Sequence, residues 1–266
     1  MKPAPPPAAT LCVTKFYDAN ANGVKDGNEQ DINGWLFQLF ADDNLLLIKE
    51  TPRCMVVDPG NYTVTEANPV ETNWVHTTEP QVGVSLAAGD TQDVAFGNVC
   101  LGAGGGLTLG FWSNKNGQRL ETAADFSFLT ALCLRNATGA NQDFPGTNSL
   151  ATNQALLNSW LLSANATNMA YMLSAQLAAM ELNVRHGFVS GARLVRTGGC
   201  GNAGFDGSFI SINDLMAAAN AELCAHPYTL SGSVRAHQEC LKNALDDANN
   251  NRNFVESSPC PFSFSQ

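Results

Sequence analysis

The sequence predicts an α+β protein of two domains, an N-terminal antiparallel β-sandwich followed by a mostly α-helical domain. Three observations carry this prediction. Residues 11–100 contain short apolar runs separated by turn residues, residues 101–106 are rich in glycine, and the chain beyond them is rich in Ala, Leu, Asn and Met with helical periodicity. A chain of 266 residues is long enough for two such domains.

Residues 1–10 form a Pro- and Ala-rich arm, which we expect to be extended polyproline II.

The short apolar runs of residues 11–100 predict the strands of the sandwich. Runs at this spacing, several of them alternating apolar and polar residues, are typical of a β-sandwich. The expected strands are residues 11–17, 35–40, 45–49, 54–57, 62–66, 73–77, 82–86 and 94–99.

Residues 101–106 predict a flexible linker, and residues 107–258 a helical domain. Ser211 and Asp214 resemble a capping box at the start of the helix that ends near Ala225. The expected helices are residues 123–136, 150–162, 167–185, 212–225 and 233–247. Residues 198–207 predict a glycine-rich loop. Residues 259–266 predict an extended C-terminal tail that alternates Phe and Ser, and we expect this tail to add as an edge strand to the sandwich of a neighbouring copy.

The composition favours some classes of partner and excludes others. The net charge is −10, and only 14% of the residues are charged. A nucleic-acid or anionic-membrane binder needs a basic face, so these classes are disfavoured, whereas cations are suitable partners. No run approaches the roughly 20 apolar residues of a membrane span.

Eight scattered cysteines predict disulfide bonds in an extracellular or cell-surface protein. Cys224 and Cys240 are expected to join two helices. The alternative is a zinc site made by these two residues with His226 and His237. The sandwich holds three cysteines and the rest of the chain five, so complete pairing requires a link between domains or between subunits.

Residues 18–29 match the twelve-residue calcium loop at its diagnostic positions. Side-chain oxygens fall at positions one, three, five, nine and twelve, and a carbonyl oxygen is expected at position seven. Gly23 stands at position six, where the loop turns sharply. The predicted Ca²⁺ ligands are Asp18, Asn20, Asn22, Val24, Asp26 and Glu29. The alternative is an acidic turn without a metal.

The segments KFYDANANGVKDGNEQDINGW, DPGNYTVTEANP and VAFGNV resemble the SdrD B-like and Cna B-type repeats of bacterial surface proteins. The resemblance covers residues 11–100. It implies a transthyretin-like sandwich that binds calcium beside its first strand and serves as a rigid extracellular spacer or as a module for bacterial adhesion.

The same resemblance implies a further candidate site, because some Cna B-type domains contain an internal Lys–Asn isopeptide bond promoted by an acid. The matching residue types are Lys15, Asn98 and Glu66. A neutral buried amine could attack the Asn carboxamide if a protonated Glu polarised it. The alternative is a solvated Lys15, with the neighbouring Phe16 facing the core.

The segments LTLGFWSNKNG and AQLAAMELN resemble, more weakly, a helical domain of secreted bacterial proteins with no assigned activity. No catalytic motif surrounds the histidines, so we expect no enzymatic activity. The sequence thus predicts an extracellular calcium-binding structural protein that self-assembles by head-to-tail contacts into a filament or adhesive layer. The alternatives are a monomeric adhesin that binds carbohydrate or protein and a secreted hydrolase.

Overall fold

The computed structural model describes residues 6–200 and 209–265, and the chain divides into two units. The first, here called the β-unit, comprises Met1–Leu101 and Glu256–Gln266, and the second, the helical unit, comprises Gly102–Val255. Residues 1–5 of the expected arm, Gln266 of the tail and most of the expected glycine-rich loop lie outside the described residues.

Each of the eight expected strands is present in the β-unit. The strands are β1 (Ala9–Tyr17), β2 (Leu36–Ala41), β3 (Asn44–Glu50), β4 (Arg53–Val57), β5 (Gly60–Glu66), β6 (Trp74–His76), β7 (Gln81–Leu86) and β8 (Thr91–Gly102). One sheet has the order β4-β1-β8-β6 and the other has the order β3-β2-β5-β7.

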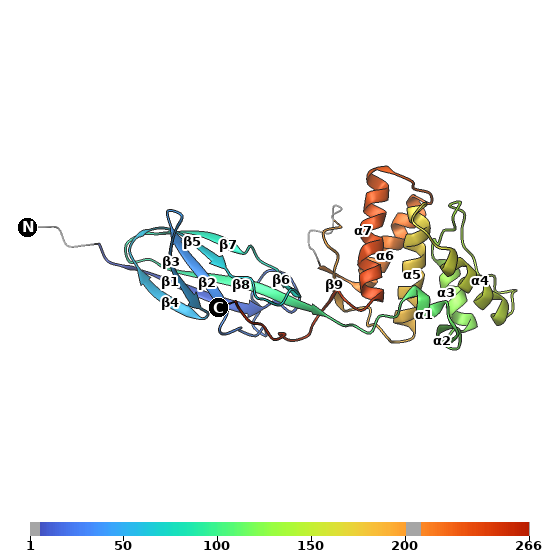
Figure 1. Ribbon diagram of the computed structural model, residues 1–266, viewed down its shortest axis with the longest axis horizontal. Helices are drawn as coiled ribbons and strands as arrows, with labels where there is room; N and C mark the ends of the chain where they lie inside the picture. Colours follow the sequence, from blue (N-terminus) through green and yellow to red (C-terminus); the bar gives the residue numbers. More distant parts are fainter. Residues whose placement is uncertain (1–5, 201–208, 266) are drawn as a thin grey trace, which may run out of the picture. The chain divides into compact units, whose positions relative to one another are not determined.

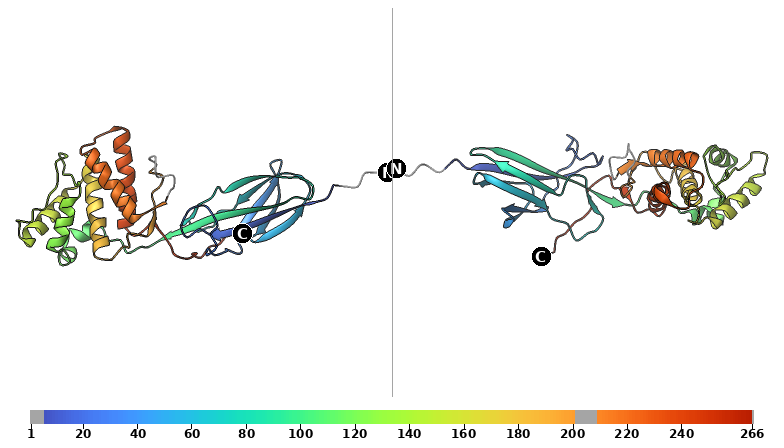
Figure 2. Two further views of the ribbon diagram at one scale, coloured as in Figure 1. Left: turned by 180° about the vertical axis from the view of Figure 1, so that it is seen from behind. Right: turned by 90° about the horizontal axis from the view of Figure 1, so that it is seen from above.

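The two sheets face each other and enclose one apolar core (Figure 1, Figure 2). Strand β5 shows how the alternating sequence builds this core. Tyr62 and Val64 point inward between exposed or half-exposed neighbours, and Glu66 is the next inward residue of the same strand. The pleat that buries the apolar side chains of β5 therefore also buries a carboxylate at the end of the strand.

The expectation of a purely antiparallel sandwich is wrong at one position. Strands β1 and β8 pair in parallel, with Lys15 opposite Phe96 and Tyr17 opposite Asn98. Strand β8 follows β7, which lies in the opposite sheet, so no hairpin within its own sheet fixes its direction. Alternation of apolar residues does not reveal strand direction, which is why the sequence could not show this pairing.

All eight cysteines form disulfides within their own unit. The pairs are Cys12–Cys54, Cys100–Cys260, Cys133–Cys224 and Cys200–Cys240. The expected need for a link between domains disappears because the C-terminal segment belongs to the β-unit and brings Cys260 to Cys100. Four disulfides are typical of secreted or cell-surface proteins.

The predicted Cys224–Cys240 disulfide is wrong, and so is the zinc alternative. On one side, Asn220 accepts a hydrogen bond from the backbone N–H of Cys133, which brings Cys133 to the face of the helix that carries Cys224. On the other side, the sulfurs of Cys200 and Cys240 both lie near the carbonyl oxygen of Thr197. Cysteines engaged in disulfides cannot supply the thiolates that a zinc site requires.

The C-terminal tail packs on its own β-unit. The carbonyl oxygen of Ser263 accepts a hydrogen bond of 2.8 Å from the backbone N–H of Val70. Phe262 and Phe264 contact Trp35, with ring centroids 4.8 and 5.5 Å apart. The sequence leads us to expect this tail as an edge strand on a neighbouring copy. In the structure, its contacts with Val70 and Trp35 hold it on its own β-unit.

The helical unit is built around α5 (Met169–Arg185), whose side chains are buried on nearly every face. It packs against α1 (Leu109–Trp112), α3 (Ala123–Ala131), α6 (Ile212–Ala225) and α7 (Gly232–Asn249). The remaining elements are α2 (Lys115–Gln118), α4 (Leu150–Ser163) and the short strands β9 (Leu194–Arg196), β10 (Phe209–Ser211) and β11 (Phe254–Val255).

The expected helices are present, but α3 ends five residues early. Leu132 adopts an extended conformation at its C-cap, and the residues after it include a bridge between Arg135 and Asn141. The short helices α1 and α2 were not expected. Within the described ranges, no helix is both long and apolar enough to cross a bilayer.

Gly97 on β8 provides a test of how tightly the β-unit is packed. A Cβ atom there would lie 2.6 Å from the Phe16 ring and 2.7 Å from the Thr77 hydroxyl. We expect Gly97→Ala to lower the free energy of unfolding by about 1–3 kcal/mol, because the ring must move to accommodate the methyl group. Urea denaturation measures this change. Gly83→Ala on β7 is the control, since nothing lies within 4 Å of the added atom; equal effects of the two substitutions would contradict the packing argument.

Candidate functional site

Lys15, Glu66 and Asn98 meet in the interior of the β-unit, here called the buried triad. Lys15 on β1 and Asn98 on β8 belong to one sheet, and Glu66 on β5 belongs to the sheet that faces it. Lys15 pairs with Phe96, and Asn98 lies two residues further along β8, so both side chains project from the same face. The parallel pairing of β1 and β8 thus aligns the amine with the carboxamide.

The geometry of the triad centres on one carboxylate oxygen. Glu66 Oε1 lies 2.5 Å from Lys15 Nζ and accepts a hydrogen bond of 2.6 Å from Asn98 Nδ2. The three residues are between 1% and 4% exposed. Both nitrogens that would be exchanged in an amide transfer are therefore held on the same oxygen, away from water.

Burial alters the chemistry of the amine. Loss of solvation lowers the pKa of Lys15 to about 8, against the opposing charge and hydrogen bond of Glu66. The Lys15 ammonium also lies 4.6 Å from the centroid of the Trp35 ring. A lysine with this pKa has a substantial neutral fraction near neutral pH, and only the neutral amine is nucleophilic.

The alternative of a solvated Lys15 is therefore wrong in the structure. Phe16 is also buried, but it packs over Gly97 and Thr77 rather than in the apolar core between the sheets. The two neighbouring residues are buried on opposite faces of β1, so the sequence alternatives were not exclusive.

His76 on β6 is a neighbour of the triad that the sequence did not identify. Its Nδ1 lies 3.2 Å from Asn98 Oδ1 and 3.3 Å from Glu66 Oε2. The only signal in the sequence is the Trp-x-His spacing, which places His76 on the same face of β6 as the buried Trp74.

An aromatic cluster covers the lysine side of the triad. Trp35 lies between Lys15 and the C-terminal tail, and it contacts Trp74, Phe262 and Phe264 with centroid distances of 5.0, 4.8 and 5.5 Å. The tail is thus part of the apolar surroundings of Trp35. Such surroundings exclude water, which is the physical cause of the lowered pKa of Lys15.

The loop of residues 18–29 brings some of the predicted calcium ligands together. Asp26 Oδ2 accepts hydrogen bonds from the side-chain amides of Asn20 and Asn22, at 2.7 and 3.1 Å. Asp18 accepts backbone N–H groups of Asn22 and Gly23, at 3.0 and 2.7 Å. Gly23 has φ of +76°, which is the turn that position six requires.

Glu29 provides the test of whether this loop suits a cation. Its Oε2 accepts a hydrogen bond from the backbone N–H of Asp26, whereas its Oε1 is buried without a hydrogen-bond partner. Among the described residues, no three His, Cys, Asp or Glu side chains are grouped so that they could hold a metal ion. The expected set relies on amide and carbonyl oxygens as well, which are usual calcium ligands, so the unpartnered Oε1 of Glu29 is the feature of the loop that is compatible with a cation.

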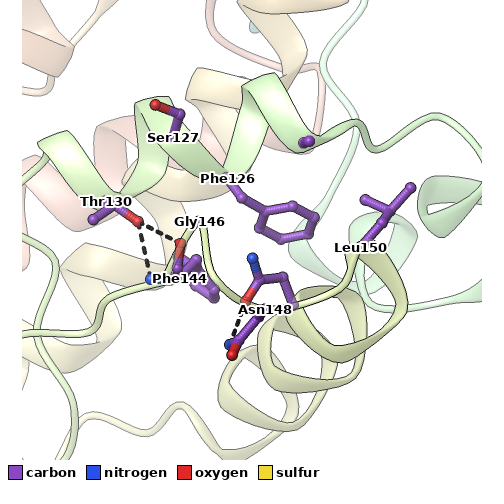
Figure 3. Close-up of a pocket in the computed structure, with 9 residues that line it drawn as sticks. Phe126, Ser127, Thr130, Phe144, Gly146, Asn148 and Leu150 are labelled. Carbon is purple, nitrogen blue, oxygen red and sulfur yellow. Dashed lines mark hydrogen bonds between the residues drawn. The ribbon is translucent and has the colours of Figure 1, made fainter.

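A pocket of about 160 Å³ lies between α3 and the start of α4 in the helical unit. Phe126, Asn148 and Leu150 gather around it, and the Thr130 hydroxyl bonds to the backbone of Phe144 at its edge (Figure 3). None of the described residues that line it has an ionisable side chain. We therefore assign no chemistry to this pocket.

Glu121 is the other buried acid of note. It precedes α3, and both of its carboxylate oxygens are buried without a hydrogen-bond partner. Burial, and then the negative charge of Asp125, raise the pKa of Glu121 to about 7. Asp125 itself bonds to Arg185 Nε at 3.0 Å and to His186 Nε2 at 3.2 Å, so its own charge is compensated.

Comparison with known proteins adds little. No protein family matches the chain, and no curated protein matches it. Among solved structures, the minor pilin GBS52 of the gram-positive pathogen Streptococcus agalactiae matches with 15% identity and a TM-score of 0.26. The match covers 35% of this chain and 44% of the pilin, so the chain spans less than half of that protein. A TM-score this low does not by itself indicate a shared fold.

The raised pKa of Glu121 makes stability depend on pH. The folded state binds this proton more tightly than the unfolded state, whose pKa is near 4.5, so the free energy of unfolding falls as pH rises from about 4.5 to 7. Over that pH range the free energy of unfolding of the wild type should fall by an amount on the order of 2 kcal/mol because of this residue. We expect Glu121→Gln not to show this decrease, since its side chain does not titrate. Urea denaturation across pH measures the difference between variant and wild type. Glu239→Gln, a substitution at a half-exposed acid, is the control; parallel curves for Glu121→Gln and wild type would contradict the assignment.

Proposed function

We propose that this protein is an extracellular structural protein whose β-unit is locked by an isopeptide bond between Lys15 and Asn98. The observation that carries the proposal is the buried triad, in which one oxygen of Glu66 holds the amine and the carboxamide nitrogen at 2.5 and 2.6 Å. Burying a lysine requires compensation by a partner and by packing. A lysine that is buried between two sheets beside a carboxamide suits a covalent role.

The reaction needs no external reagent. The neutral amine of Lys15 attacks Cγ of Asn98, forming a new C–N bond, and the bond from Cγ to Nδ2 breaks. The amine loses a proton, the leaving nitrogen gains one, and ammonia departs. Glu66 Oε1 contacts both nitrogens, so it is suited to carry that proton from one to the other.

The location of this bond supports a structural role. Lys15 is on the first strand and Asn98 on the last strand before the helical unit. A covalent bond between these positions would let a pulling force pass from β1 directly to β8, without unfolding the 82 residues between them. The disulfides Cys12–Cys54 and Cys100–Cys260 tie the same two strands to β4 and to the tail. Resistance to load and to proteolysis is what an extracellular spacer needs.

The bond changes the mass of the protein, which gives a direct test. We expect the intact wild-type chain to be lighter by the mass of one ammonia, about 17 Da, beyond the loss from its four disulfides. Lys15→Ala, Asn98→Ala and Glu66→Gln should each keep the full mass, and Lys25→Ala, an exposed lysine of the same unit, is the control that should still lose ammonia. A wild-type chain at full mass in mass spectrometry, with Lys15 and Asn98 in separate tryptic peptides, would refute the proposal.

The loop of residues 18–29 favours a second role, calcium binding beside β1. The supporting observation is the buried, unpartnered Oε1 of Glu29, together with Asp26 held next to Asn20 and Asn22. Asp18, Asn20, Asn22, Asp26 and Glu29 would supply side-chain oxygens and Val24 its carbonyl oxygen. Three carboxylates on such a loop suit affinities of about 10⁻⁴–10⁻³ M, as in other extracellular modules.

Removal of calcium should destabilise the β-unit, because the carboxylates of the loop would lose their counter-charge. We expect Glu29→Gln to weaken binding at least tenfold in isothermal titration calorimetry, since it removes a charged ligand. Glu79→Gln, an exposed acid of the same unit, is the matched control and should bind normally. Equal melting temperatures of the wild type in calcium and in excess chelator would count against a calcium site.

Assembly into a filament or adhesive layer stays a prediction. Since the tail packs on its own β-unit, the described surface that favours self-association is the edge strand β3, where Leu45, Leu46 and Ile48 are about half exposed. The first alternative is a monomeric adhesin, and the less favoured one is a secreted hydrolase. The expectation that the protein is not an enzyme also stays a prediction.

A further inference from the structure

The nitrogen and the oxygen of the Asn98 carboxamide face different residues. Its Nδ2 donates to Glu66 Oε1, and its Oδ1 lies on the other side, 3.2 Å from His76 Nδ1. An amide oxygen can only accept a hydrogen bond, so His76 Nδ1 must carry a hydrogen in this contact. The carbonyl that would be attacked is thus bonded to His76 and not to Glu66.

The second ring nitrogen of His76 also faces an acceptor. Its Nε2 lies 3.0 Å from Asn68 Oδ1, and its Nδ1 lies 3.3 Å from Glu66 Oε2, a buried oxygen with no hydrogen-bond partner. With acceptors on both nitrogens, the form of the ring that satisfies every neighbour is the doubly protonated imidazolium. The side chain of His76 is 29% exposed, so the ring is partly open to solvent, whereas the side chain of Glu66 is fully buried.

We propose that His76, as an imidazolium, is the catalytic residue that polarises the Asn98 carboxamide and stabilises the oxyanion formed when Lys15 attacks it. This inference rests on the Lys15–Asn98 bond proposed above. It transfers to His76 the polarising role that the resemblance to Cna B-type domains implied for a protonated Glu66. Glu66 then acts as the proton carrier between the two nitrogens.

Each step balances within the four side chains. Lys15 Nζ attacks Cγ of Asn98, and the electron pair of the C=O bond moves to Oδ1, where the N–H of His76 Nδ1 stabilises it. Glu66 Oε1 takes a proton from Nζ and delivers it to Nδ2. The electron pair then returns from Oδ1, the bond from Cγ to Nδ2 breaks, and ammonia leaves, so His76 ends in the state in which it began.

A purely structural His76 would make a different prediction. In that case the ring would only hold β6 against β8, and its loss would lower stability without a specific effect on the rate of bond formation. Rescue by a small molecule separates the two roles. Free imidazole can replace a missing catalytic ring in a partly exposed site, but it cannot restore lost packing of a strand.

The experiment follows ammonia loss after cell-free synthesis under oxidising conditions, with the bonded fraction read from intact mass at successive times. We expect His76→Ala to form the bond about 10²–10³-fold more slowly than the wild type, the usual effect of removing a donor to an oxyanion. Added imidazole should restore part of that rate. His76→Gln, which keeps a neutral N–H donor, should react at an intermediate rate, and His226→Ala in the helical unit should react like the wild type.

The outcomes separate this inference from the proposed function. If the wild type never loses ammonia, the isopeptide bond itself is refuted. If the wild type forms the bond and His76→Ala forms it equally fast, the bond stands and the role of His76 is refuted. A slow His76→Ala that imidazole does not accelerate, in a chain with native circular dichroism, would overturn the catalytic role, and a His76→Gln as fast as the wild type would overturn the need for a charged ring.

Discussion

The burial of one lysine is the constraint on which the β-unit depends. Moving an ammonium from water to a protein interior costs several kcal/mol unless a partner and good packing offset it. Lys15 is offset by Glu66 at 2.5 Å and by the face of Trp35 at 4.6 Å. These contacts require β5 to bring its last inward residue to the interior, and they require the two sheets to face each other at this point.

The burial of Lys15 also explains four features that lie far apart in the sequence. The parallel pairing of β8 with β1 places Asn98 beside Lys15, and the absence of a side chain at Gly97 leaves room for the Phe16 ring. The C-terminal tail covers Trp35 with Phe262 and Phe264, and Cys260 ties that tail to β8. A segment more than 150 residues away in sequence thus helps to keep water from the amine.

The helical unit is organised by a different principle, a buried network of amides. Asn183 on α5 donates to the carbonyl oxygen of Leu107 and to Asn249, and it accepts a hydrogen bond from Trp112. Asn249 in turn bonds to Gln176. Neutral amides can satisfy one another without the desolvation cost of charges. This accounts for a chain that is rich in Asn and contains only 14% charged residues.

The sequence by itself determined the α+β class, the eight strands of the β-unit and the longer helices, because alternation, helical periodicity and turn residues are local signals. The residue types of the triad came from the resemblance of residues 11–100 to Cna B-type repeats. Only the tertiary structure decided the direction of β8, the disulfide partners of Cys224 and Cys240, and the docking of the tail. It also decided which atoms of Glu66 and His76 face Asn98. These features depend on distances between segments far apart in the chain, and local patterns of polarity contain no information about which distant face or atom a side chain meets.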